Sequence, residues 1–197
     1  MIQRIVLLSS FLFFFTACNQ NQPTGSTIEI LEEQSFHENG MIESFNTYEN
    51  GKLNGFSLEI DKYGNVLKQL TYADGELNGE QLYYNSSGRV EQKANYVIGV
   101  LNGELVNYYS NRNAKEETIY KDGKRNGLTV WYFIGGTESI SYNYKMGVLD
   151  GEAKQYYKTG EIKSEGRYLN GNKVGTWKIY SISGMEALEE YGQGETK

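Results

Sequence analysis

Residues 120–127 read YKDGKRNG, in which two glycines stand four positions apart in a polar setting. This spacing fits either a backbone loop that cradles a phosphate group or a chain reversal. A phosphate loop would occur once and would open a helix. Here the same stretch occurs six times, each time before a segment with the alternation of a strand. We therefore interpret it as a turn whose glycines supply positive φ angles.

Residues suited to catalysis or metal binding are few in this chain. The only histidine, His37, stands in FHENG and is interpreted as a solvated turn residue, while the only cysteine is Cys18. The sequence has no serine–histidine–aspartate order and no His/Cys cluster with metal-ligand spacing. We expect a protein that is not an enzyme and that uses no cofactor or metal. A hydrolase is the weakest alternative.

Carboxylates are common, but they are arranged by repetition. Glu80, Glu104 and Glu152 occupy one repeated position, whereas a glycosidase needs one unique pair. We interpret these three residues as a solvated column. Asp61 and Asp74, with nearby turn carbonyls, have the oxygen chemistry for Ca²⁺, but the calcium repeat Gly-Gly-x-Gly-x-Asp is missing. The carboxylates therefore predict no reaction centre.

Composition limits the class of protein and of partner. The chain has 197 residues and a net charge of −6, with 19 basic and 25 acidic residues and no basic block. Nucleic acid is therefore not an expected partner. The 17 tyrosines, 23 glycines and single proline favour ordered strands over disorder.

The dominant feature of the sequence is a repeat without gaps. Tyrosine recurs every 24 residues, at Tyr48, Tyr72, Tyr96, Tyr120, Tyr144 and Tyr168. Each tyrosine is followed after three residues by a glycine and after seven by another, at Gly55, Gly79, Gly103, Gly127, Gly151 and Gly175. A third glycine column lies between these stretches and is broken only at Arg112. Six such units predict a repeat architecture.

Strand-like segments of about eight residues separate the turns. In GFSLEIDKYG, for example, Phe56, Leu58 and Ile60 share one face. Each unit is interpreted as a strand, a tight turn at the third glycine column, a second strand, and a wider turn at the YKDGKRNG-type stretch. The sequence thus predicts an all-β fold, an elongated single-layer antiparallel meander of β-hairpin repeats with about 13 strands.

The two ends of the repeat are irregular. The segment ILEEQSF predicts a lone first strand, and after Gly184 the phase breaks because Tyr191 comes one residue early. Glu186, Glu189 and Glu190 would protect an exposed last edge. GMEALEEYG is also open to interpretation as a helical turn.

The pattern Tyr-x-x-Gly-x-x-x-Gly, followed by aromatic residues and a further glycine, resembles the MORN-repeat variant. This repeat occurs in bacterial proteins labelled as YwqK-type antitoxins. The resemblance covers about residues 31–197, as about six full units with partial caps. It identifies a class of repeat and leaves the function open, because such repeats occur in proteins of many roles. An antitoxin-like role is one option that it implies.

The N-terminus has the features of a targeting segment. Arg4 precedes an apolar run, Ile5 to Phe15, that is too short to span a membrane as a helix. The following stretch from Phe15 to Cys18 resembles the lipobox of bacterial lipoproteins, with Phe15 in place of the usual leucine. The resemblance implies cleavage before Cys18 and lipidation of its thiol. The alternative is an ordinary signal peptide with an incidental cysteine.

This N-terminus divides the chain and predicts its location. We expect a signal peptide at residues 1–17, the lipidated cysteine with a flexible tether at residues 18–30, and the repeat domain at residues 31–197. Asn19 and Gln20 follow Cys18, so the aspartate that resembles an inner-membrane retention signal is missing. An exported lipoprotein anchored in the outer membrane is therefore favoured.

Six aromatic residues depart from the main alternation and are the candidates for a binding surface: Tyr83, Tyr109, Trp131, Phe133, Tyr157 and Trp177. On a single-layer sheet some of them should be accessible, and tyrosine and tryptophan are common at binding hot spots. The alternative is that they pack on one another as a second ladder that stabilises the sheet.

The sequence therefore predicts a non-catalytic, lipid-anchored interaction module that binds an unidentified protein of the bacterial envelope. An immunity or antitoxin-like role is one version of this hypothesis. The alternative is a lipoprotein that binds glycan or peptidoglycan through its rows of aromatic residues.

Overall fold

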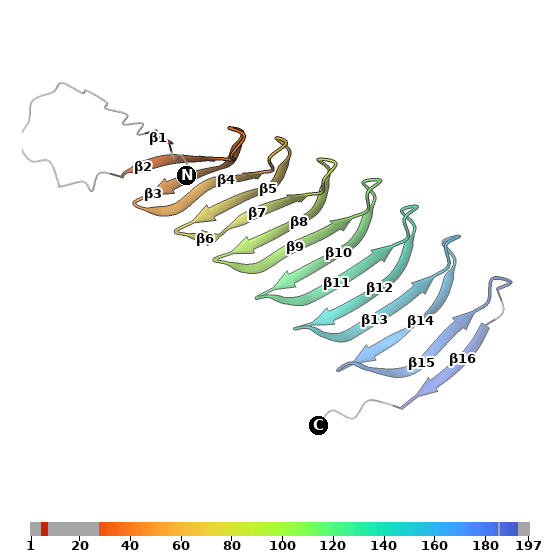
Figure 1. Ribbon diagram of the computed structural model, residues 1–197. Helices are drawn as coiled ribbons and strands as arrows, with labels where there is room; N and C mark the ends of the chain where they lie inside the picture. The colour runs from red at the N-terminus through yellow and green to blue at the C-terminus, as the bar shows by residue number, and fades with distance from the viewer. Residues whose placement is uncertain (1–4, 8–27, 185, 193–197) are drawn as a thin grey trace, which may run out of the picture.

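The computed structural model describes residues 5–7, 28–184 and 186–192 as strands and turns, without a helix among them (Figure 1). Within these ranges no helix is long and apolar enough to cross a membrane. Of residues 1–17, the predicted signal peptide, only residues 5–7 are described, as β1, and Cys18 lies outside the described residues. The strands are β1 (Ile5–Leu7), β2 (Ile30–Phe36), β3 (Ile42–Glu49), β4 (Lys52–Ile60), β5 (Val66–Ala73), β6 (Glu76–Leu77), β7 (Gly79–Tyr84), β8 (Val90–Val97), β9 (Val100–Tyr108), β10 (Ala114–Lys121), β11 (Lys124–Tyr132), β12 (Glu138–Lys145), β13 (Val148–Tyr156), β14 (Ile162–Leu169), β15 (Asn172–Tyr180) and β16 (Glu186–Tyr191).

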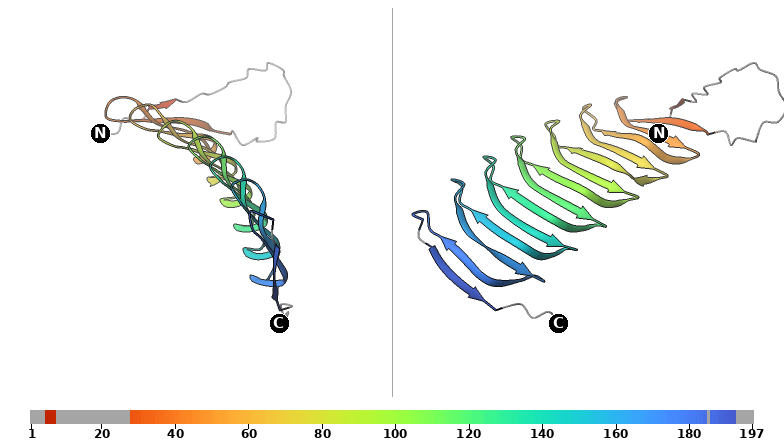
Figure 2. Two further views of the ribbon diagram at one scale, coloured as in Figure 1. Left: turned by 90° about the vertical axis from the view of Figure 1, so that its right-hand side faces the viewer. Right: turned by 180° about the vertical axis from the view of Figure 1, so that it is seen from behind.

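All strands belong to one antiparallel sheet in which spatial order follows chain order, with β6 paired to β5 beside the main path. Figures 1 and 2 show a single elongated layer of curved strands that twists along its length. This confirms the predicted single-layer meander. The sheet has 16 strands instead of about 13, because β1 lies in the N-terminal segment, one strand is divided into β6 and β7, and a further strand, β16, follows Gly184.

The turn that contains YKDGKRNG is the tighter of the two kinds, contrary to the sequence interpretation. Lys121 pairs with Lys124, so only Asp122 and Gly123 form the loop. Both have positive φ angles, 50° and 75°. Two residues with positive φ match the right-handed twist of the flanking strands and favour Asp-Gly or Asn-Gly.

The glycines of the third column close a longer loop. At the turn after β7, Asn85 N donates to Arg89 O at 2.9 Å, and Gly88 N donates to Asn85 O at 2.9 Å. Three residues thus lie between the paired ends, and glycine takes the left-handed position among them, with φ of 69° at Gly88. The predicted order of tight and wide turns is therefore wrong, although both were correctly placed.

In five of the six YKDGKRNG-type stretches the second glycine lies inside a strand, at a bulge, whereas Gly79 is the first residue of β7. Gly127 is in β11 with a φ of 119°. The register of β10 and β11 shifts on either side of it, between the pairs Thr118↔Thr129 and Tyr120↔Arg125. A bulge adds a residue to one strand and bends it. These glycines therefore account for the bend of each hairpin.

The buried side chains form thin rows across the strands instead of a deep core. One row consists of cross-strand pairs, most of which join a larger and a smaller side chain: Ser57↔Leu70, Gln81↔Ala94, Leu105↔Thr118 and Thr129↔Tyr142, with the small pair Ala153↔Gly166. Seven of these ten residues are buried, and the other three, Leu105, Tyr142 and Gly166, are half-buried. Each repeat is thus stabilised mainly by the adjacent repeats.

The C-terminal segment forms a strand, so the helical-turn interpretation of GMEALEEYG is wrong. β16 pairs with β15 from Gly175↔Tyr191 to Tyr180↔Glu186. It is the last strand of the sheet, and Glu189 and Glu190 are exposed on it. Charged residues on an edge strand disfavour further pairing.

Candidate functional site

A hollow of about 480 Å³ on the sheet surface brings two of the six predicted aromatic residues together. It spans the end of β9, β10, β11 and β12. Its walls are Tyr109, Lys115, Trp131, Tyr132, Ser139, Ile140 and Tyr142. We call it the Trp131 hollow.

Trp131 is held in place by a cation on one side and an aromatic edge on another. The guanidinium of Arg125 lies 5.6 Å from the centroid of the Trp131 ring and 5.6 Å from that of Tyr144. Arg125 Nη2 also pairs with Glu116 Oε1 at 2.6 Å. The Tyr142 ring meets Trp131 edge to face, with centroids 6.0 Å apart. Trp131 is therefore half-buried and rigidly placed.

A chain of aromatic contacts leads from this hollow towards the C-terminal edge. Tyr142 contacts Tyr168 at 5.8 Å, Tyr168 contacts Trp177 at 5.2 Å, and Trp177 contacts Tyr191 at 6.3 Å, all edge to face. These rings pack on one another across the strands. For Trp177 this agrees with the alternative in which the aromatic residues form a second ladder that stabilises the sheet.

Trp177 is buried rather than accessible. Only 2% of its surface is exposed. Its indole Nε1 donates to the carbonyl oxygen of Arg167 at 3.2 Å, and Lys173 Nζ lies 4.2 Å from the ring centroid. The prediction of an accessible binding residue is thus wrong for Trp177, because the ring occupies space left free by Gly166 on the neighbouring strand.

Tyr109 and Tyr157 have a structural use for their hydroxyl groups. Tyr109 Oη donates to Tyr132 O at 2.8 Å, and Tyr157 Oη donates to Tyr180 O at 2.8 Å. In both cases the tyrosine follows the last residue of a strand, and its hydroxyl group donates to a backbone carbonyl oxygen of the next repeat. Tyr109 nevertheless lines the Trp131 hollow with its ring, whereas Tyr157 does not.

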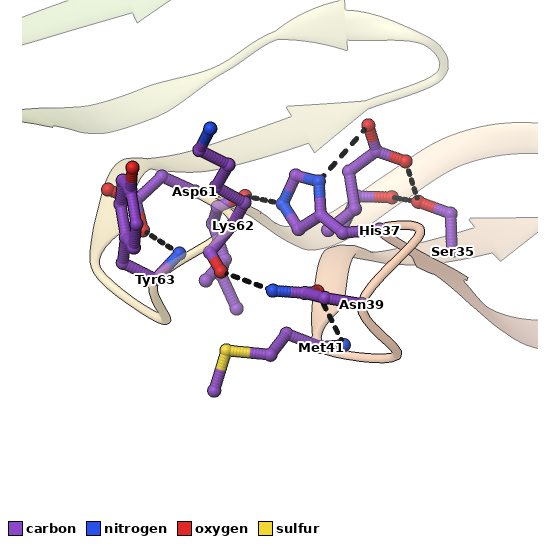
Figure 3. Close-up of polar contacts among 10 residues, drawn as sticks. Ser35, His37, Asn39, Met41, Asp61, Lys62 and Tyr63 are labelled. Carbon is purple, nitrogen blue, oxygen red and sulfur yellow. Dashed lines mark hydrogen bonds and ion pairs between the residues drawn. The ribbon is translucent and has the colours of Figure 1, made fainter.

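His37 performs the same structural role in the first repeat. Its Nε2 donates to Ile60 O at 2.8 Å, and its Nδ1 lies 3.9 Å from Glu43 Oε1. Asn39 Nδ2 likewise donates to Lys62 O at 2.7 Å. Figure 3 shows His37 and Asn39 directed towards the turn at Lys62. The interpretation of His37 as a solvated residue is therefore wrong, since its side chain is only 21% exposed.

Tyr83 and Phe133 are half-buried and stand apart from the Trp131 hollow. Burial raises the pKa of Tyr83, and the neighbouring Tyr96 raises it further. Phe133 belongs to a turn, where its N–H donates to Thr137 O at 2.8 Å. Of the six predicted residues, the structure thus brings only Tyr109 and Trp131 to one hollow.

The carboxylate of Asp61 is occupied by local hydrogen bonds, and that of Asp74 pairs with Lys52 at 3.6 Å. Asp61 Oδ1 accepts from the N–H groups of Tyr63 and Asn65 at 2.8 and 2.9 Å, and Oδ2 accepts from Asn65 Nδ2 at 2.9 Å. Hydrogen bonds from Asn65 lower the pKa of Asp61. Among the residues that the structure describes, no three His, Cys, Asp or Glu side chains are grouped to hold a metal ion.

Tyr132 closes one side of the Trp131 hollow and is tied to the adjacent strand. Its hydroxyl donates to Glu117 Oε2 at 2.8 Å. Burial, and then this hydrogen bond to a carboxylate, raise the pKa of Tyr132 far above its ordinary value. Lys115 is the exposed cation at the hollow. Sequence alternation could not predict this combination, because Lys115 and Ser139 are the residues at which the strand register shifts.

Two stretches of the chain match a known family model. Residues 77–97 and 149–170 match the model of the MORN repeat variant. Each match begins after a two-residue turn and covers one hairpin, β7–β8 or β13–β14. Both matched stretches are hairpins of the sheet, and the Trp131 hollow lies between them. No curated protein matches the chain at a significant level.

Proposed function

We propose that this protein is a lipid-anchored interaction module of the bacterial envelope and that the Trp131 hollow receives a side chain of a protein partner. The observation that carries the proposal is this hollow of about 480 Å³, walled by three tyrosines and a tryptophan and bordered by one exposed lysine. Aromatic pockets on a rigid scaffold are typical anchor sites at protein interfaces.

The architecture supports binding as the role of the sheet. Each hairpin contacts mainly its neighbours, so the repeats together display a long surface. The Trp131 ring at the hollow is held by Arg125 and Tyr142 before any partner binds. Preorganised side chains lose little conformational entropy on binding, which favours affinity.

The orientation of the rings favours a protein partner over a glycan. A sugar-stacking platform needs open ring faces, and at Trp131 one face is approached by the Arg125 guanidinium while Tyr142 meets the ring edge to face. An apolar side chain entering the hollow needs no such platform. Glycan or peptidoglycan binding is the second candidate, favoured by the presence of Trp131 and three tyrosines at one hollow.

Export and anchoring rest on the N-terminal sequence. The apolar segment before Cys18, and the likeness of residues 15–18 to a lipobox, support lipidation of that cysteine and attachment to the outer membrane. A toxin is one partner that suits an immunity or antitoxin-like version of the proposal.

Affinity capture tests the proposal. The full-length chain in detergent is immobilised and exposed to detergent-solubilised envelope proteins and, separately, to purified peptidoglycan. We expect one stoichiometric protein, retained by wild type and lost with Trp131→Ala and with Lys115→Glu. Lys115 is exposed, so its substitution leaves folding intact. Tyr63→Ala is the matched control, since Tyr63 is 73% exposed and remote from the hollow.

Retention on peptidoglycan with no captured protein would favour the glycan candidate. Equal capture by wild type, Trp131→Ala and Lys115→Glu would contradict the assignment of the hollow as the site. The absence of any retained protein or glycan would contradict the interaction module itself.

A further inference from the structure

A second hollow, of about 420 Å³, gathers positive charge on this acidic chain. Its apolar walls come from Leu82, Val90 and Tyr108, and its cations are Arg89, Lys93 and Arg112. No carboxylate is among its lining residues, although the chain carries a net charge of −6. We call it the arginine hollow.

The arginine hollow opens on the face opposite to that of Trp131. Leu82 pairs with Lys93, and Tyr83 pairs with Gln92, so successive residues alternate between the two faces. Trp131 is the repeat equivalent of Tyr83, and it pairs with Ile140. The two hollows are therefore separate sites, and the inference drawn here does not rest on the proposed function.

Arg112 stands where other repeats have glycine. Its φ is 75°, in the left-handed region, and the equivalent positions are Gly40, Gly64, Gly88, Gly136, Gly160 and Gly184. A residue other than glycine is strained in this conformation. The cation is thus held at the hollow at a conformational cost that a glycine would avoid, which points to a use for its charge.

Arg89 is oriented by the backbone of the adjacent turn. Its Nη1 donates to Ser110 O at 2.6 Å, which leaves other guanidinium N–H groups available. Lys93 differs, because its Nζ pairs with Glu104 Oε2 at 3.0 Å. Arg89 and Arg112 have no ion pair with another described residue. They therefore supply the unbalanced charge at the hollow.

We propose that the arginine hollow binds a small organic anion, a carboxylate or a phosphate monoester carried on an apolar body. Guanidinium groups bind both anions through paired N–H donors. Leu82, Val90 and Tyr108 would cover the apolar part of the ligand. The two arginines come from consecutive turns, so the ligand bridges two repeats.

Isothermal titration calorimetry on the full-length protein in detergent tests this site. The probes are phenyl phosphate, benzoate and the neutral benzyl alcohol. We expect phenyl phosphate or benzoate to bind with one-to-one stoichiometry, and benzyl alcohol to bind at least about tenfold more weakly, because it lacks the charge that the arginines bind. Affinity should fall as salt is added.

Arg112→Gly is the decisive variant, because it removes the cation and restores the glycine of the other repeats. It should melt at or above the wild-type temperature and bind the anion at least about tenfold more weakly. Lys158→Gln removes one exposed charge at another turn of the same edge and should bind as wild type does. Trp131→Ala should also retain the anion. Equal affinity of wild type and Arg112→Gly, or equal binding of benzyl alcohol and the two anions, would overturn the proposal.

Discussion

The indole of Trp177 lies directly against the backbone of Gly166 on the adjacent strand. A Cβ at position 166 would stand 2.3 Å from Trp177 Cδ2, closer than any real contact. Gly166 is outside the set of glycines with positive φ, so packing and not backbone conformation explains its identity. Trp177 can therefore be buried at this place only because residue 166 has no side chain.

Gly166→Ala should destabilise the C-terminal repeats. The added methyl group must displace the indole or bend β14, an overpacking that costs about 1–3 kcal/mol. Urea unfolding followed by tryptophan fluorescence would measure the loss. Gly135→Ala is the control, because a Cβ there meets no atom within 4 Å, and it should change stability by less than about 0.5 kcal/mol. Equal stability of both variants would show that the contact is not tight.

Gln81 substitutes for a missing backbone partner where one repeat strand is divided into β6 and β7. The side chain is fully buried, its Oε1 accepts from Thr71 N at 2.7 Å, and its Nε2 donates to Thr71 O at 3.0 Å. Gln81→Leu leaves the Thr71 N–H without this acceptor and should cost about 1–3 kcal/mol. Hydrogen exchange at the Thr71 amide should accelerate. Gln92→Leu, at a half-buried position, should leave that amide protected; protection retained in Gln81→Leu would refute the assigned role.

The hydroxyl groups of Tyr109 and Tyr157 should stabilise the junctions between repeats. Tyr109→Phe and Tyr157→Phe each remove one hydrogen bond to the next repeat, and each should lower the free energy of unfolding by about 1 kcal/mol. Tyr63→Phe, at an exposed turn, is the control and should have no effect in thermal unfolding. If both junction variants had the same Tm as the wild type, the two hydrogen bonds would not stabilise the junctions between repeats.

Phe133 occupies the same repeat position without a hydroxyl group, which allows the reverse experiment. By analogy with Tyr109 and Tyr157, Phe133→Tyr should place a donor at the carbonyl oxygen of Tyr156 and stabilise the protein by up to about 1 kcal/mol. Differential scanning calorimetry would detect the rise in Tm. A lower Tm would mean that the geometry of this junction differs from the other two.

Stability should decline at alkaline pH because the phenol groups of several tyrosines have a higher pKa in the folded state than in the unfolded state. Burial raises the pKa of Tyr72, Tyr83, Tyr132, Tyr144 and Tyr168. A raised folded pKa gives stability that is complete below the unfolded value of about 10 and is lost as the pH rises through the folded value. Absorbance at 295 nm should show late titration of these phenols, and the urea midpoint should fall from pH 9 to pH 11. Titration of all tyrosines near pH 10, together with a urea midpoint that does not change between pH 9 and pH 11, would contradict this expectation.

The repeat made most of the fold predictable from sequence. The 24-residue spacing of tyrosine and glycine located the hairpins, and the alternation within them identified strands. The positions of the glycines alone did not predict which of the two turns is shorter. Gly127 lies in a strand bulge and Gly123 in a turn, and both have positive φ angles. Asp122 before Gly123 was the available signal for a two-residue turn.

The candidate site was predicted only in part, because a single-layer sheet hides side chains through neighbour-specific packing. Trp177 and Trp131 both depart from the main alternation, yet of the two only Trp177 lies against the backbone of a described glycine, Gly166 on the neighbouring strand. Comparison of cross-strand sizes could have revealed this, since Ala153 and Gly166 are both small beside Trp177. Arg112 was visible as a break in the glycine column, but its proximity to Arg89 depends on how consecutive turns stack.

Photocrosslinking in living cells tests the central claim, that the Trp131 hollow binds a protein partner, most directly. A photoreactive amino acid replaces exposed Lys115 at the hollow or, as the control, exposed Lys158 at a distant turn. We predict one protein adduct from position 115, absent from position 158 and abolished when Trp131→Ala is added. No adduct from position 115, or the same adducts from both positions, would contradict the account.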